Sequence, residues 1–238
     1  PVLFIKDLPP ASSVSIKVTR PQIYFGEITN DFVIVGTKKK EFDYPAGDTA
    51  ATTSYSGAGG VQLKSAFPRT LLATHFQSMN VLLSGDASND SRVLFRREIR
   101  DRAQRVFPFL ILDSDPYLVV DQDGTFKWIM DAYTSSSRYP YSRRIGDNTN
   151  YLRNSVKIVI DAYDGNVKGY ISDKSDPLIR SYAGAFPGIL LPLESMPPSL
   201  RAHVRYPEDL FRAQNVMYSV YHMTDAGTYY NREDEWTV

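Results

Sequence analysis

The sequence predicts an α+β fold in which antiparallel β-hairpins and helices occupy separate stretches of the chain. Asp-Gly pairs at Asp123-Gly124 and Asp164-Gly165 each lie between apolar, alternating segments, and this is the strongest short-range signal for a β-hairpin. The helical patterns gather in other stretches and do not alternate with single strands. That grouping favours α+β over a series of βαβ units.

Four sub-regions are expected within one domain that spans residues 1–238. With 238 residues and 42% hydrophobic side chains, the chain is long enough to bury a sizeable core. We expect residues 1–60 to be mainly β, 61–106 helical, 107–175 built from β-hairpins and 176–238 helical.

The first sub-region should contain three strands and then a loop. The segments "SVSIKV", "QIYFGEI" and "DFVIVGT" alternate or are rich in β-branched and aromatic residues, and Pro21 and Asn30-Asp31 separate them. Residues 45–60 are small and polar, which predicts a loop.

Two helices are expected in the second sub-region. Residues 61–83 carry apolar side chains at loosely helical spacing, and residues 92–106 form an arginine-rich segment before Pro108. We expect the arginine-rich helix to be solvated, with Glu98 and Asp101 pairing locally. The alternative is that its arginines face lipid phosphates or a partner.

The last sub-region should hold a short helix, "PPSLRAHVRY", and a longer one. The longer helix begins with Pro207, Glu208 and Asp209, a proline at the first position followed by acids near the positive end of the helix dipole. Its inward stripe is expected to comprise Leu210, Phe211, Gln214, Met217, Tyr218 and Tyr221.

Composition excludes several classes of chemistry. The absence of cysteine excludes disulfides, thiolate nucleophiles and Cys-ligated zinc. Lys plus Arg equals Asp plus Glu at 27 each, so a general nucleic-acid binder is not expected. No apolar run approaches the ~18 residues of a spanning helix. Because the chain starts at Pro1, we expect it to be a piece of a longer protein. No cofactor and no metal are predicted.

Two carboxylates in "DSDPY", Asp113 and Asp115, are the first candidate contacts. In an extended segment both would lie on one face, where paired carboxylates can act as acid and base or bind a cation. Asp before Pro is also ordinary turn chemistry, and we expect that role. His203 is a further candidate contact, although the three histidines lack metal-site spacing.

The segment "DAYTSSSRYPYS", residues 131–142, begins the most distinctive loop, expected over residues 133–153. Tyr133 should pack, whereas residues 134–138 have no apolar side chain and should lie at the surface. Tyrosine, serine and arginine are typical of adaptable recognition surfaces. The alternative is an ordered loop that satisfies its own backbone. The candidate contacts are Asp131, Arg138, Tyr139, Tyr141, Asn150 and Arg153.

Several segments, in this order, carry a family resemblance: "RPQIYFGE", "EFDYP", "PFLILDSDPYLVV", "WIMDAYTSSSRYPYS", "NYLRNSVKIVIDAYDG" and "LRAHVRYPEDLF". Together they resemble the large soluble region of uncharacterised protein family 0182, a group of bacterial multi-pass membrane proteins. The resemblance implies a bundle of spanning helices outside this chain and a position on the extracytoplasmic side of the cell membrane. It implies no activity.

The expected function is a non-catalytic extracytoplasmic domain that binds a ligand or protein partner through the 133–153 loop and the Asp113–Asp115 edge. One alternative is an envelope hydrolase that uses Asp113, Asp115 and Asp131 as acid, base or metal ligands. Another is a structural cap over the membrane bundle. Convergence of these three carboxylates and His203 in one pocket would favour the hydrolase.

Overall fold

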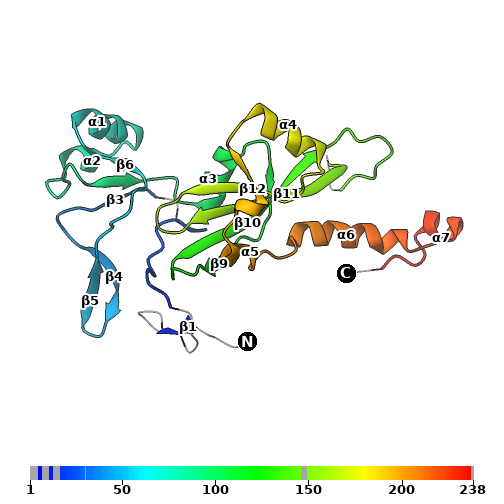
Figure 1. The fold of residues 1–238 in the computed structure, drawn as a ribbon, viewed down its shortest axis with the longest axis horizontal. Coiled ribbons are helices and arrows are strands. Elements are labelled where there is room, and N and C mark those ends of the chain that lie inside the picture. Colours follow the sequence, from blue (N-terminus) through cyan, green and yellow to red (C-terminus); the bar gives the residue numbers. More distant parts are fainter. Residues whose placement is uncertain (1–4, 7–10, 13–16, 30, 146–148, 237–238) are drawn as a thin grey trace. The chain divides into compact units, whose positions relative to one another are not determined.

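The computed structural model describes residues 5–6, 11–12, 17–29, 31–145 and 149–236. It has the predicted α+β architecture, with antiparallel pairing in most of its sheets and helices in separate stretches (Figure 1). Among the residues described, no helix combines the length and apolar composition that crossing a bilayer requires.

The chain divides into two compact units. Unit 1 comprises residues 1–106, 118–128 and 159–167. Unit 2 comprises residues 107–117, 129–158 and 168–238. This division reflects how the chain packs and does not test whether the two units fold separately. A single domain over residues 1–238 therefore stays a prediction.

The largest sheet is built on two long strands, β10 (Phe126–Ser136) and β11 (Tyr151–Asp161). Its order is β13-β12-β11-β10-β8, and β9 also pairs with β10. The shorter strands are β8 (Ile111–Leu112), β9 (Tyr117–Val120), β12 (Val167–Ile171) and β13 (Leu190–Pro192). Gly124 and Gly165 have φ of 78° and 71°, a conformation that favours glycine. Both predicted hairpin turns are therefore confirmed.

The described residues of unit 1 also form three smaller sheets and three helices. The strands are β1 (Ile5–Lys6) with β2 (Ala11–Ser12), the hairpin of β4 (Glu41–Ala46) and β5 (Thr49–Thr53), and the sheet of β3 (Val33–Val35), β7 (Arg92–Leu94) and β6 (Val61–Gln62). The helices are α1 (Ala66–His75), α2 (Met79–Leu83) and α3 (Ile99–Val106).

Three expectations for unit 1 are wrong. The predicted loop at residues 45–60 contains β5, whose threonines suit a strand. The segment "QIYFGEI" forms no strand and makes only a single bridge at Gly26. The predicted helix at residues 92–106 begins as β7, because Val93 is fully buried between strands β3 and β6. The segment "SVSIKV" lies largely outside the described residues.

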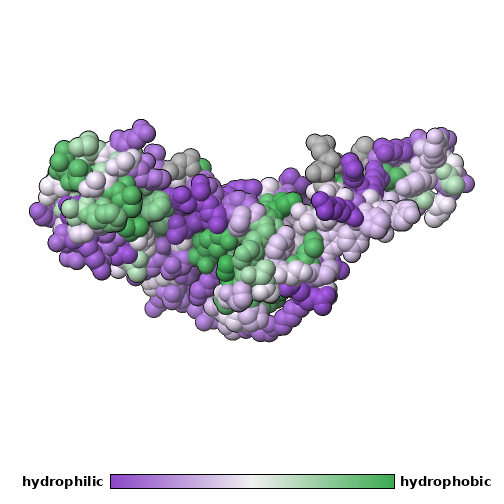
Figure 2. All heavy atoms as spheres, turned by 90° about the horizontal axis from the view of Figure 1, so that it is seen from above, coloured by the Kyte–Doolittle hydropathy of each residue, from purple (hydrophilic) through white to green (hydrophobic). Residues whose placement is uncertain are grey.

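A small apolar core holds the helical part of unit 1. Its buried members are Leu63, Leu72, Ala73, Val81, Ala87 and Val93. Phe67 and Leu71, which belong to the helical apolar pattern in the sequence, are instead 77% and 58% exposed. Hydrophobic residues are accordingly visible at the surface over α1 and α2, at the left of Figure 2.

Unit 2 holds the remaining helices: α4 (Pro177–Ala185), the 3₁₀ turn η1 (Leu193–Ser195), α5 (Pro198–Arg201), α6 (Glu208–Tyr221) and α7 (Ala226–Asn231). Helix α6 begins after Pro207 with two acids in its first turn, as predicted. Its predicted inward stripe is wrong, because Phe211, Tyr218 and Tyr221 are each more than half exposed. The residues that α6 buries are Ala213, Ser219 and Val220.

Candidate functional site

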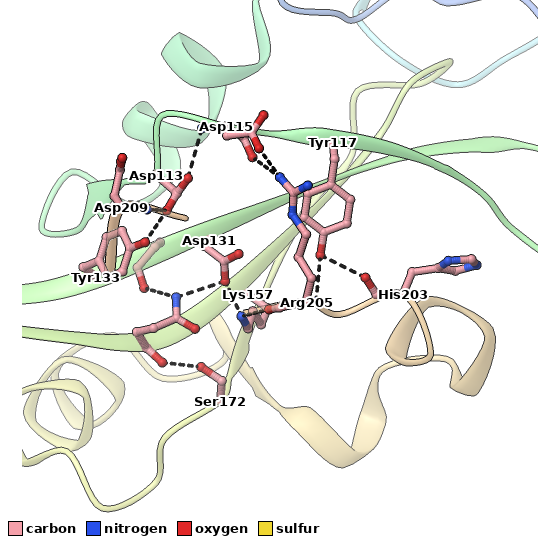
Figure 3. Close-up of polar contacts among 12 residues, drawn as sticks. Asp113, Asp115, Tyr117, Asp131, Tyr133, Lys157, Ser172, His203, Arg205 and Asp209 are labelled. Carbon is pink, nitrogen blue, oxygen red and sulfur yellow. Dashed lines mark hydrogen bonds and ion pairs between the residues drawn. The ribbon is translucent and has the colours of Figure 1, made fainter. Parts of the chain in front are cut away.

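Asp113 lies directly after β8 and is 1% exposed. Its carboxylate accepts hydrogen bonds from the Tyr133 hydroxyl and from the backbone N–H groups of Asp115 and Asp209, the last two at 3.0 and 3.2 Å (Figure 3). Burial, and then the bond to Asp113, raise the pKa of Tyr133. Asp113 therefore joins β10 to the first turn of α6 from inside unit 2.

Asp131 and Lys157 face each other from strands β10 and β11. Lys157 donates to the Asp131 carboxylate and, at 3.2 Å, to the carbonyl oxygen of Arg205. Asn154 donates to the same carboxylate at 3.0 Å. Burial raises the pKa of Asp131, although Lys157 and Asn154 act in the opposite direction. The carboxylate thus already holds a cation and an amide.

Asp115 is the partly exposed member of the group. Arg205 forms an ion pair with its carboxylate and donates to its carbonyl oxygen at 3.1 Å. The guanidinium also lies 4.1 Å from the ring centroid of Tyr117, a cation–π contact. The Tyr117 hydroxyl donates at 3.1 Å to the carbonyl oxygen of His203. The imidazole of His203 points away from the carboxylates (Figure 3).

Asp113, Asp115 and Asp131 are therefore brought into one network, whereas His203 joins it only through its backbone. Each carboxylate is already engaged by side-chain or backbone donors, as described above. In the described part of the chain, no group of three or more His, Asp or Glu side chains could hold a metal ion. Asp113 makes a local turn bond with the backbone N–H of Asp115, whereas Asp131 lies within β10 and is not a turn residue.

Sequence reasoning missed the partners of these carboxylates, chiefly Lys157, Arg205 and Asp209. Asp209 binds both the backbone N–H and the hydroxyl of Ser114 at 2.7 Å. One signal was available for Lys157, because it is the lone charge inside the apolar segment "SVKIVI". A lysine in a strand that is buried on both faces requires an acidic partner.

The loop after β10 is shorter than predicted. Because β10 continues to Ser136 and β11 begins at Tyr151, the connection covers residues 137–150, of which 146–148 lie outside the described residues. Tyr133 packs, as expected, with 1% of its surface exposed. The predicted exposure of Thr134 is wrong, because its hydroxyl is buried and donates to Asp176 at 2.5 Å.

Asp176 is a fully buried carboxylate at the N-terminus of α4. It accepts from the hydroxyls of Thr134, Ser155 and Tyr151 and from two backbone N–H groups, those of Leu178 and Ile179. Burial tends to raise the pKa of Asp176, but hydrogen bonds led by the Ser155 and Thr134 hydroxyls outweigh it and lower that pKa below its usual range. The network fixes the base of the loop.

The first half of the loop is anchored on this base. Asn150 accepts from the backbone N–H of Tyr139 at 3.1 Å and donates to its carbonyl oxygen at 2.6 Å. The Tyr139 ring stacks on Tyr151, with centroids 4.8 Å apart, and Tyr151 donates to Asp176 at 2.6 Å. Arg153 pairs with Asp173 at 3.2 Å. The side chains of Asn150 and Arg153 thus bind other residues of this chain.

The tip of the loop comprises Arg138, Tyr139 and Tyr141, and in the part that the structure describes the side chains of Arg138 and Tyr141 make no such contacts, whereas Tyr139 is anchored as above. Arg138 is exposed, Tyr139 is 49% exposed and Tyr141 is fully exposed. Tyr141 also has a φ of 60°, a left-handed conformation that costs a bulky side chain about 1–3 kcal/mol.

Comparison with known proteins gives the family. The model of the Uncharacterised protein family (UPF0182) matches residues 1–238. The chain belongs to this family. The UPF0182 protein of Desulforamulus reducens is 49% identical over 239 residues, covering 100% of this chain and 26% of that protein. A UPF0182 protein of Geobacter sulfurreducens is 49% identical over 238 residues, and one of a Sulfurovum species is 48% identical over 243 residues, again across 100% of this chain.

The chain spans about a quarter of the length of the UPF0182 relatives that it matches, 26–27% in the three named above. The family is uncharacterised and its name carries no activity. No solved structure matches the chain.

Proposed function

We propose that this chain is the extracytoplasmic part of a bacterial membrane protein of UPF0182, and that it binds a protein partner through the tip of the 137–150 loop without catalysing a reaction. Tyr141 is the observation that carries the proposal. A fully exposed tyrosine in a left-handed conformation gains nothing from packing, and strain of this kind gathers at binding sites.

The chemistry of the tip suits a protein surface. Tyr139 and Tyr141 flank Pro140, which fixes its own φ and restricts Tyr139. Rings held on a stiff segment lose little conformational entropy on binding. Tyrosine and arginine are enriched where interfaces concentrate their binding energy, and Arg138 supplies the cation beside the two rings.

The internal engagement of Asp113, Asp115 and Asp131 supports a non-catalytic role. A hydrolase would need a carboxylate free to take up a proton or to hold a metal-bound water. Here the two most buried of these three carboxylates, Asp113 and Asp131, each accept at least two hydrogen bonds. The membrane context rests on the resemblance to multi-pass proteins and on the relatives' length beyond this region.

Site-specific photocrosslinking in cells tests the binding role. Full-length protein with benzoylphenylalanine in place of Tyr141 should give a discrete, light-dependent crosslink to a second protein. The matched control is Tyr230, another tyrosine of unit 2, which is 84% exposed and should give none. A crosslink from neither position, or from both equally, would contradict the proposal.

Cysteine labelling tests the location. The chain lacks cysteine, so a Ser137→Cys variant of the full-length protein reports from the exposed loop if any cysteines elsewhere are removed. A membrane-impermeant maleimide should label it in intact cells. Ser91→Cys is the control, because Ser91 is fully buried and should react only after denaturation. Labelling of Ser137→Cys only after permeabilisation would place the chain in the cytoplasm.

A further inference from the structure

A cavity of about 330 Å³ in unit 1 is lined by three arginines, Arg96, Arg102 and Arg105. Its apolar wall comes from Phe95, Val106 and Val167, and no acidic residue lines it. All of these residues belong to unit 1. Among the described residues, only one of the three guanidinium groups has a carboxylate partner: Arg105 pairs with Asp101 at 3.0 Å, one turn away on α3.

Arg102 is held rigidly by neutral groups. Its guanidinium donates to the carbonyl oxygens of Gly165, Phe95 and Arg96, the last two at 3.4 and 3.3 Å. It also lies 4.6 Å from the ring centroid of Phe25. Within the described residues these contacts include no carboxylate, so the positive charge of Arg102 remains uncompensated at the cavity.

Arg96 brings a second positive charge to the cavity, although it also lines a neighbouring pocket with Asp31, Glu98 and Asp101. Arg96 lines the same cavity as Arg102, and the Arg102 guanidinium donates to the Arg96 carbonyl oxygen. Burial, and then the charge of Arg96, lower the pKa of Arg102. The described residues provide no carboxylate within ion-pair distance of the exposed Arg96 side chain. Its backbone is left-handed, with φ of 50°. Two guanidinium groups that line one cavity with no acidic residue in its lining repel each other and are suited to a bidentate anion.

We propose that this cavity binds a phosphate group, carried either by a soluble phosphate ester or by a phospholipid headgroup. Arg96 and Arg102 would neutralise the phosphate, since planar guanidinium groups match its oxygens with paired hydrogen bonds. The apolar wall formed by Phe95, Val106 and Val167 would contact the carbon part of the ester. The site rests on unit 1 alone and does not depend on the partner-binding loop.

The first experiment tests whether the phosphate comes from a soluble ester. It measures thermal unfolding of the 238-residue chain in inorganic phosphate and in glycerol phosphate, each compared with chloride at equal ionic strength. A ligand that binds only the folded state raises the melting temperature. We expect a rise for the wild type, and about tenfold weaker binding for Arg96→Gln, as the loss of one charge-assisted contact implies. Arg212→Gln is the control, because Arg212 pairs with Glu208 on α6, and it should bind like the wild type.

Vesicle sedimentation distinguishes the lipid source. The vesicles consist of phosphatidylcholine with phosphatidic acid. If the chain binds them, if Arg96→Gln abolishes this binding and Arg212→Gln keeps it, and if the soluble phosphates have no effect, the ligand is a lipid headgroup. If the soluble phosphates instead bind with an affinity similar to that of the vesicles, the natural ligand is a soluble phosphate ester. Three results would overturn the site: no binding in either assay, equal binding by Arg96→Gln, or an equal loss in Arg212→Gln.

Discussion

The ammonium group of Lys157 and the carboxylate of Asp131 form an ion pair from which solvent is almost excluded, with side chains 6% and 3% exposed. The two residues come from the neighbouring long strands β10 and β11. Removal of two charges from water is costly, and the cost is met only when both charges remain paired and hydrogen-bonded. Asn154 and the Arg205 carbonyl complete that set of bonds.

Breaking this pair should therefore be among the most damaging single changes in unit 2. We expect Lys157→Met to lower the free energy of unfolding by about 3–5 kcal/mol, because Asp131 is left buried without its cation. Urea unfolding of the purified chain measures this. Lys174→Met is the control, because Lys174 and Glu194 form an exposed pair and the change should stay within about 1 kcal/mol. Equal effects of the two substitutions would contradict the account.

The buried carboxylate of Asp176 should set part of the acid sensitivity. Its pKa is lowered in the folded state, so between that value and the unfolded value of about 3.9 the unfolded chain binds more protons. Stability from Asp176 is thus present above about pH 4 and is lost as the pH falls through the folded pKa. Asp131, whose pKa is raised, acts in the opposite sense.

Asp176→Asn should accordingly flatten the fall in unfolding free energy below about pH 4, measured by urea unfolding across the acid range. Asp48→Asn, at an exposed turn residue, serves as the comparison. If the free energy of unfolding of Asp176→Asn falls with acid as steeply as that of the wild type, then other groups cause the acid sensitivity.

The hairpins could be predicted from sequence because their signals are local. Gly124 and Gly165 each provide the left-handed backbone that the turn requires. The start of α6 is equally local, since a proline and two acids fix it. Tertiary packing determines which face of α6 is buried, so the expectation that its aromatic residues face inward was wrong.

The candidate site was only partly predictable for the same reason. The sequence drew attention to Asp113, Asp115 and Asp131, but their roles depend on partners far along the chain, such as Arg205, 90 residues beyond Asp115. Thr134 gives another example. It has a polar side chain in a polar run, and its burial becomes favourable through the distant Asp176 and Ser155.

The strained backbone of Arg96 gives a third prediction. Arg96→Gly should raise the free energy of unfolding by about 0.5–1 kcal/mol. Glycine adopts a φ of 50° without the roughly 1–2 kcal/mol penalty of other residues, but the greater conformational entropy of glycine in the unfolded chain offsets part of that gain. Arg100→Gly makes the same chemical change in the first turn of α3 and should destabilise by about 0.5–1 kcal/mol. A loss of stability in Arg96→Gly would mean that the arginine is retained for packing.

We predict that the carboxylates of unit 2 stabilise its fold, whereas the tip of the loop contributes little to stability and is free to bind. Urea unfolding of two single variants, Asp113→Asn and Tyr141→Ala, measures both contributions. Asp113→Asn should cost about 2–3 kcal/mol, because an amide cannot accept from Tyr133 and two backbone N–H groups as the carboxylate does. Tyr141→Ala should change stability by no more than about 0.5 kcal/mol. A nearly neutral Asp113→Asn together with a loss of several kcal/mol in Tyr141→Ala would contradict the claim, since the carboxylate would then be free for chemistry and the ring would be part of the core.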